Sequence, residues 1–159
     1  MRPVAIRELM KIGLAMIKED SLLVVRKRGT ICFILPGGKP EGRENDLEAL
    51  RRELREELGC VVVAPRYAGA FTDKAADLQN TVVTVRLYTG TLRGEPQPAS
   101  EIEELAWLKL TQPVNLPLAP SITNKILPYL RDRITAKAPK AGPRSRRRAS
   151  GPSGRPVHA

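Results

Sequence analysis

The chain has 159 residues, of which 42% are hydrophobic and 28% charged, a composition typical of one globular domain with its own core. Its single histidine, His158, is the penultimate residue, which excludes histidine-based catalytic triads and zinc helices from the fold. Two cysteines, Cys32 and Cys60, are too few for a zinc cluster or a disulfide framework, and we interpret both as buried apolar residues in a reducing compartment. Carboxylates, backbone groups and basic side chains therefore have to perform any chemistry.

The net charge of +10 is concentrated at the carboxyl end. Of 27 lysines and arginines, seven lie in residues 137–159, which contain no acid; the other 20 face 17 acidic residues, a net charge of +3. That segment is rich in Pro, Gly, Ala and Ser, so we predict a domain over residues 1–136 and a disordered basic tail over 137–159, with weak non-specific affinity for nucleic acid. We see neither a targeting signal nor an apolar run of membrane-spanning length, and predict a cytoplasmic protein without a membrane partner.

Taken in chain order, apolar runs bounded by Gly, Pro and polar residues predict a series of strands. The predicted strands cover residues 10–17, 22–27, 32–35, 60–65, 67–71, 82–88 and 102–110. The first two are expected to pair as a hairpin, the third to end at a Pro-Gly-Gly loop, and residues 72–80 and 89–100 to form loops. Strands around a central helix, with a second helix at the end, predict a mixed α/β or α+β domain.

Two helices are predicted by their capping signals. Asn45 and Glu48 form an N-terminal capping pair, the following residues are strongly helical, and Gly59 is suited to a left-handed C-terminal position. Ser121 is expected to cap a last helix that reaches about residue 134. Pro128 within it predicts a kink or a late start.

The central helix carries an unusual set of acids. Leu50, Leu54 and their neighbours one turn away form an apolar stripe that faces the sheet, whereas Glu53, Glu56 and Glu57 have i, i+3, i+4 spacing along one edge. Like charges at this spacing repel, and the negative end of the helix dipole disfavours them. A hard divalent cation such as Mg²⁺ or Mn²⁺ would remove both penalties. A solvated acidic face paired with arginines is the alternative, and spacing alone does not decide between them.

The sequence from Gly38 to Cys60, GKPEGRENDLEALRRELREELGC, favours the metal site because it resembles a known motif. It reproduces the Nudix box, G-x5-E-x7-R-E-U-x-E-E-x-G-U with U a bulky aliphatic residue, and departs only at Cys60. Together with the flanking strands, the resemblance to MutT-like Nudix hydrolases extends over about residues 10–134. It implies an α/β/α sandwich with a mixed sheet and a catalytic loop–helix–loop.

The resemblance also implies roles for individual residues. The implied metal ligands are Gly38, Glu53, Glu56, Glu57 and, from a later loop, Glu103 or Glu104, with Glu104 preferred. Arg52 would orient the acids by pairing with Glu44. The candidate substrate-binding residues are Gly37, Gly38, Lys39, Arg26 and Arg28. Lys27 lies between the two arginines, and at least one of these basic residues or Lys39 is expected to hold phosphate. A basic strand end is equally consistent with a solvated edge.

The function implied is that of a Mg²⁺- or Mn²⁺-dependent pyrophosphohydrolase, which cleaves a nucleoside diphosphate linked to another group. We expect (d)NTPs or modified nucleotides as substrates. Residues 75–80 contain neither Pro nor Tyr, which disfavours the Nudix sub-families that act on ADP-ribose or diadenosine polyphosphates. One alternative is an enzyme acting on the triphosphate end of RNA. The other, from a different class, is a nucleic-acid-associated binding protein that uses the Nudix fold and is anchored by its tail.

Overall fold

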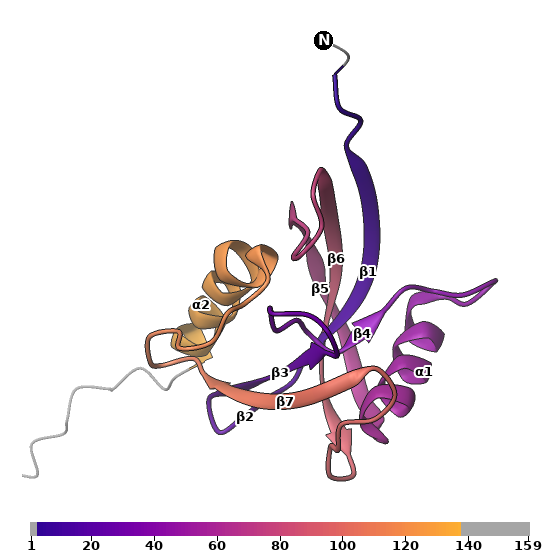
Figure 1. The fold of residues 1–159 in the computed structure, drawn as a ribbon. Helices are drawn as coiled ribbons and strands as arrows, with labels where there is room; N and C mark the ends of the chain where they lie inside the picture. Colours follow the sequence, from indigo (N-terminus) through magenta and orange to yellow (C-terminus); the bar gives the residue numbers. More distant parts are fainter. Residues whose placement is uncertain (1–2, 138–159) are drawn as a thin grey trace, which may run out of the picture.

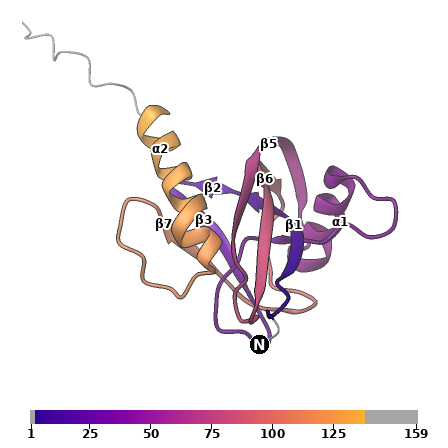
Figure 2. The same cartoon turned by 90° about the horizontal axis from the view of Figure 1, so that it is seen from above.

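The computed structural model describes residues 3–137, which form two β-sheets with helical segments on both sides (Figure 1). The strands are β1 (Arg7–Ala15), β2 (Ile17–Lys18), β3 (Ser21–Lys27), β4 (Gly37–Gly38), β5 (Val61–Lys74), β6 (Thr81–Arg93) and β7 (Ile102–Lys109). The helical segments are α1 (Asp46–Leu58), the π-helical turn η1 (Ile122–Ile126) and α2 (Leu127–Lys137). Figures 1 and 2 place α1 and α2 on opposite sides of the strands. The predicted α/β/α sandwich is therefore confirmed.

One sheet is mixed and the other antiparallel. The mixed sheet has the order β4-β1-β6-β5, in which β1 and β6 are parallel, and the second sheet has the order β2-β3-β7. The predicted hairpin over residues 10–27 is wrong in its main part, because only the two residues of β2 pair with β3. The chain changes partner at Met16: the Leu14 N–H donates to Pro36 in one sheet, while the Met16 carbonyl accepts from Leu23 in the other.

Several strand boundaries differ from the prediction because cross-strand pairing overrides local turn signals. β5 and β6 pair along both strands, with register shifts at residues 63–66, which include Pro65, and at residues 67–69. The predicted loops 72–80 and 89–100 therefore shrink, since β5 continues to Lys74 and β6 to Arg93. In the predicted strand 32–35, Phe33 and Ile34 form only isolated bridges.

The core lies on both faces of the strands. In β3, Leu22 and Val24 pack on the α2 side, whereas Leu23 and Val25 pack on the α1 side, as the two-residue period of a strand requires. α1 contributes a buried stripe, and each fully buried leucine in it stabilises the fold by about 1.5–3 kcal/mol. The buried apolar residues of α1 are Ala49, Leu50, Leu54 and Leu58.

The ends of α1 agree with the prediction, and the start of the last helix does not. The Asn45 side chain accepts the Glu48 N–H at 2.9 Å, and Gly59 has a φ of +66°. Ser121 is itself helical and makes no capping bond, and the Leu127 N–H donates to the carbonyl of Ile122, five residues earlier. This π-helical turn ends two residues before Pro128, the residue at which we predicted a kink or late start.

Other predictions have mixed outcomes. Cys60 is buried as expected, but Cys32 is partly exposed, and both are free thiols. Among the described helices none is long and apolar enough to cross a membrane. α2 ends at Lys137, and the remaining residues of the predicted tail, 138–159, lie outside the described part of the chain.

Candidate active site

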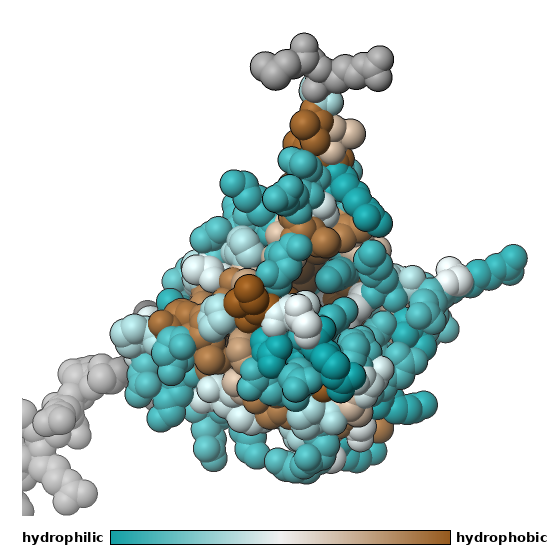
Figure 3. Space-filling view, viewed as in Figure 1, coloured by the Kyte–Doolittle hydropathy of each residue, from teal (hydrophilic) through white to brown (hydrophobic). Residues whose placement is uncertain are grey.

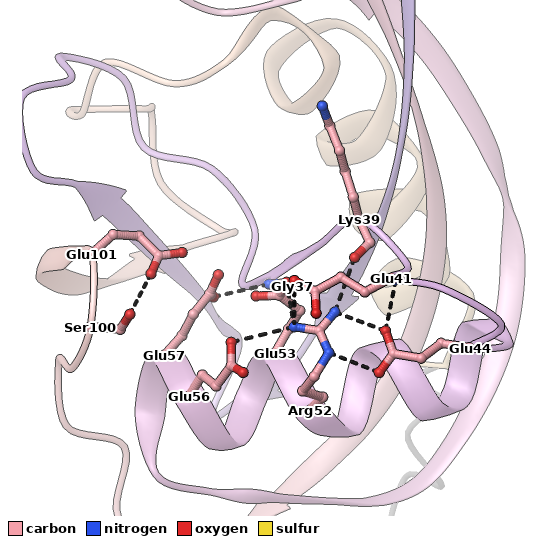
Figure 4. Close-up of polar contacts among 10 residues, drawn as sticks. All are labelled: Gly37, Lys39, Glu41, Glu44, Arg52, Glu53, Glu56, Glu57, Ser100 and Glu101. Carbon is pink, nitrogen blue, oxygen red and sulfur yellow. Dashed lines mark hydrogen bonds and ion pairs between the residues drawn. The ribbon is translucent and has the colours of Figure 1, made fainter.

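The glycine turn at β4 and the last turns of α1 bring backbone amides and carboxylates together (Figure 4). Glu57 is 1% exposed, and its Oε2 accepts the Gly37 N–H at 3.1 Å. Its other oxygen, Oε1, is buried and has no hydrogen-bond partner among residues 3–137. Burial, reinforced by the charge of Glu53, raises the pKa of Glu57 to about 8. The site thus contains a buried carboxylate with one oxygen available for a ligand.

The two glycines are required by this close approach. Gly37 has a φ of +142°, in a region that favours glycine, and a Cβ there would collide with the carbonyl oxygen of Ile12. A Cβ on Gly38 would lie 2.5 Å from Oε1 of Glu53. A side chain at position 37 would push the turn away from β1, and one at position 38 would push it away from Glu53 on α1. Glycine is therefore needed at both positions for steric reasons.

Arg52 links the acids of the site to one another. Its Nε and Nη2 donate to the two carboxylate oxygens of Glu44 at 2.8 and 2.9 Å, the predicted pairing. Its Nη1 donates to Glu53 at 3.1 Å and to Glu56 at 3.3 Å, and its Nη2 also donates to the carbonyl of Lys39 at 3.1 Å. Hydrogen bonding to Arg52 holds the pKa of Glu44 below its usual range. Arg52 therefore fixes the position of Glu53.

Glu53 lies beside Glu57 but in a different electrostatic environment. Its side chain is 12% exposed, and burial raises its pKa, although Arg52 opposes the shift. Glu56 is more than half exposed and is held by Arg52 instead. One helical edge thus presents two carboxylates to the interior and the third to solvent, because the three positions span more than one face of α1.

Glu101 is the third carboxylate beside Glu53 and Glu57, and sequence reasoning missed it. One carboxylate oxygen from each of the three lies within 4.8 Å of the other two. The turn before β7 is anchored to the end of α1, since the Ala99 N–H donates to the Glu57 carbonyl at 2.9 Å. Ser100 donates to Glu101 at 2.6 Å and lowers the pKa of that carboxyl.

Glu103 and Glu104, the acids that we selected from the sequence, lie elsewhere. They are on β7 and form ion pairs with residues at the end of β3 and just after it: Glu104 with Arg26 at 2.7 Å and Glu103 with Arg28 at 3.1 Å. The structure therefore does not bring Glu104 to the acid cluster. The sequence signal that could have found Glu101 is its place in the loop immediately before β7, since functional residues are often carried on loops.

A cleft of about 530 Å³ lies next to the acid cluster. Glu53, Glu101 and Gly38 are on its wall, together with three lysines, Lys11, Lys27 and Lys39. Of these lysines, only Lys11 was not among the candidates from the sequence. Arg26 and Arg28, which we expected to bind substrate, are ion-paired with β7 and are not on this wall. Hydrophilic residues cover most of the side of the molecule that carries α1 (Figure 3).

The residues present fit a divalent cation. The cluster offers carboxylate oxygens from two elements and a backbone turn that a Cβ would obstruct, and hard cations such as Mg²⁺ and Mn²⁺ prefer oxygen ligands. The unpaired Oε1 of Glu57 would otherwise carry an uncompensated desolvation cost.

The sequence is similar to those of known Nudix proteins. A family model described as the NUDIX domain matches residues 10–130. A Nudix hydrolase of Bacillus subtilis, YvcI, is 30% identical over 105 residues, which are 64% of this chain and 66% of that protein. An ADP-ribose pyrophosphatase of Methanocaldococcus jannaschii is 26% identical over 103 residues, 63% of this chain and 59% of that protein. The match thus spans somewhat less than two thirds of each of these relatives.

Solved structures show the same fold. The crystal structure of a MutT NUDIX hydrolase from Burkholderia pseudomallei has a TM-score of 0.64 and 23% identity, and covers 76% of this chain and 95% of its own. A MutT protein from Bacillus halodurans has a TM-score of 0.59 and 26% identity, over 74% of this chain and 81% of its own. The expected mixed-sheet architecture is therefore shared with MutT proteins.

Proposed function

The chain belongs to the Nudix family, and on that premise we propose that it is a divalent-metal-dependent pyrophosphohydrolase acting on nucleotides. The observation that carries the proposal is the buried Oε1 of Glu57, which has no partner among residues 3–137 and lies beside Glu53 and Glu101. A solvated acidic face, the alternative interpretation of the sequence, would not bury a carboxylate in this way.

Glu53, Glu57 and Glu101, with the backbone at Gly38, would hold the cation, and Glu56 stays a predicted ligand from the resemblance. A bound Mg²⁺ or Mn²⁺ supplies Lewis-acid stabilisation of the charge that develops on phosphate. The chain itself positions these groups: Arg52 orients Glu53, and the Gly37 N–H orients Glu57. A carboxylate of the site accepts the proton of the attacking water.

The substrates that we propose are (d)NTPs or modified nucleotides. Three lysines on the cleft wall support a substrate with a highly charged phosphate chain. The relative from Methanocaldococcus jannaschii acts on ADP-ribose, which makes a diphosphate capped at both ends the competing class. The triphosphate end of RNA is a second candidate, favoured by the seven unopposed basic residues in 137–159.

The test uses Glu57→Gln, which keeps the volume and the acceptor for Gly37 but removes the ionisable oxygen. Purified protein is assayed against a panel of nucleoside triphosphates, ADP-ribose and triphosphorylated RNA with Mg²⁺ or Mn²⁺. We expect turnover to fall on the order of 10²–10⁴-fold, because several kcal/mol of charge stabilisation depend on the cation.

Glu48→Gln is the matched control, since Glu48 is an exposed residue of the same helix outside the acid cluster. Its turnover should equal that of the wild type. Mg²⁺ should also raise the melting temperature of the wild type more than NaCl at equal ionic strength, and this difference should shrink in Glu57→Gln. Equal turnover in the two variants would refute the acid cluster as the metal site.

A further inference from the structure

Lys11 occupies a position on β1 where the alternating pattern calls for a small or apolar side chain. Leu9, Lys11 and Gly13 lie on one face of the strand, and Lys11 is half-buried on the wall of the cleft beside Gly38 and Glu53. Within the described part of the chain, no carboxylate oxygen lies within 4.0 Å of its amine. Among residues 3–137, Lys11 is therefore a partly desolvated cation without an ion pair.

Two further lysines make this arrangement of Lys11 less favourable. Lys27 and Lys39 line the same cleft, and burial together with their charges lowers the pKa of Lys11, while Glu57 and Glu53 oppose the shift. A half-buried lysine that lacks an ion pair and has like-charged neighbours breaks two local rules at once, which is typical of a functional site. Because a cation bound by the glutamates would cancel their attraction for Lys11, the lysines need an anion from elsewhere.

The position of Lys27 follows from the register of β3 and β7. Arg26 and Arg28, its neighbours on either side, reach across to Glu104 and Glu103. The register shifts between Arg26 and Lys27, and Lys27 lines the cleft instead of pairing with β7 acids. The end of β3 and the residue that follows it thus hold β7 with two arginines, while Lys27 between them lines the cleft.

We infer that Lys11 and Lys27 together bind the terminal phosphate of the substrate and select for substrates that end in a free phosphate. The inference rests on the proposed function and narrows its substrate class. A terminal phosphate carries close to two negative charges at neutral pH, whereas each phosphate of a diphosphate capped at both ends carries one. Two ammonium groups on the wall of one cleft, each with three donors, match the terminal group better than the capped one.

The experiment measures binding, so that it does not depend on turnover. Isothermal titration is carried out with saturating Ca²⁺, an oxygen-binding cation that offsets the charge of the glutamates. It compares inorganic tripolyphosphate, which has free ends, with ADP-ribose, which is capped. We expect the wild type to prefer tripolyphosphate, and Lys11→Gln to weaken tripolyphosphate binding on the order of 10- to 100-fold with a much smaller effect on ADP-ribose. Lys27→Gln should give the same pattern, and it provides a second test if Lys11→Gln folds poorly.

Lys109→Gln, on an exposed position of β7, is the control and should bind both compounds like the wild type. A wild type that fails to bind tripolyphosphate, or variants that lose both compounds equally, would overturn the inference. Turnover in the substrate panel is read separately. Loss of nucleotide hydrolysis in every assay would refute the proposed function while the binding data still decide the role of the lysines.

Discussion

Glu57 is an ionisable side chain that is almost completely buried. Its pKa is raised to about 8 in the folded state, first by burial, whereas an unfolded glutamate titrates near 4.3. Between these values the folded state binds a proton that the unfolded state has released. The free energy of unfolding of the metal-free protein should therefore fall as pH rises from about 4.3 to 8, by up to about 1.4 kcal/mol per pH unit.

Urea unfolding in the presence of a chelator, at several pH values across this window, measures the effect. Glu57→Gln should show a shallower dependence, because its side chain does not titrate. Saturating Mg²⁺ should also flatten the wild-type profile, since the cation competes with the proton for the carboxylate. A metal-free wild type that gains stability over this pH range would contradict the assignment of a buried, protonated Glu57.

The N-terminal loop of α1 and the helix itself behave as one unit because of Arg52. The loop carbonyl of Lys39 and the carboxylate of Glu44 both accept from the guanidinium, and Glu44 also accepts the Glu41 N–H at 2.8 Å. The same guanidinium donates to Glu53. A planar group with several donors in fixed directions is needed for this, which an ammonium does not provide.

Arg52→Lys should therefore lower activity although it preserves charge. Loss of the bidentate contact releases the loop and Glu53, and the loss of such an orienting residue typically costs about 10- to 100-fold in metal affinity or activity. Titrating activity with Mg²⁺ should show a weaker apparent metal affinity. Arg51→Lys, on the exposed face of the same helix, is the control, and an Arg52→Lys enzyme with unchanged metal affinity and turnover would contradict the role given to Arg52.

The helix α1, which is defined by local signals, was predicted well, and the strands, which depend on long-range pairing, were not. α1 was predicted almost residue for residue, since the Asn45 cap, the leucine stripe and Gly59 are all local. The partner change at Met16 and the full lengths of β5 and β6 depend on which strands meet. No local pattern states that β1 lies parallel to β6 rather than beside β3.

The same distinction applies to the site. The motif predicted Glu53, Glu57 and the Arg52–Glu44 pair because they lie on one helix and its leading loop. Glu101 belongs to the site only because the turn before β7 is bound to the carbonyl end of α1. Lys11 reaches the cleft only because β1 lies against β4. Both depend on packing between elements distant in sequence.

At the scale of the whole molecule, the basic segment 137–159 is separable from the proposed chemistry. α2 ends at Lys137, and α2 lies on the opposite side of the strands from α1, which carries Glu53 and Glu57 (Figure 2). Among residues 3–137, none of those that line the cleft comes from α2. A chain truncated after Lys137 should therefore hydrolyse mononucleotides like the full-length protein.

Affinity for nucleic acid should respond to the truncation in the opposite way. Six of the seven unopposed basic residues of this segment lie beyond Lys137, and each phosphate that they neutralise releases counterions. Binding of single-stranded RNA to the full-length protein should weaken steeply with salt. Truncation should reduce the slope of log affinity against log salt by up to about 0.7 for each phosphate that the shorter chain no longer neutralises.

Fluorescence anisotropy at several salt concentrations measures both slopes. An unchanged slope would show that residues 138–159 do not contact phosphate, and a collapse of mononucleotide turnover would place them at the active site.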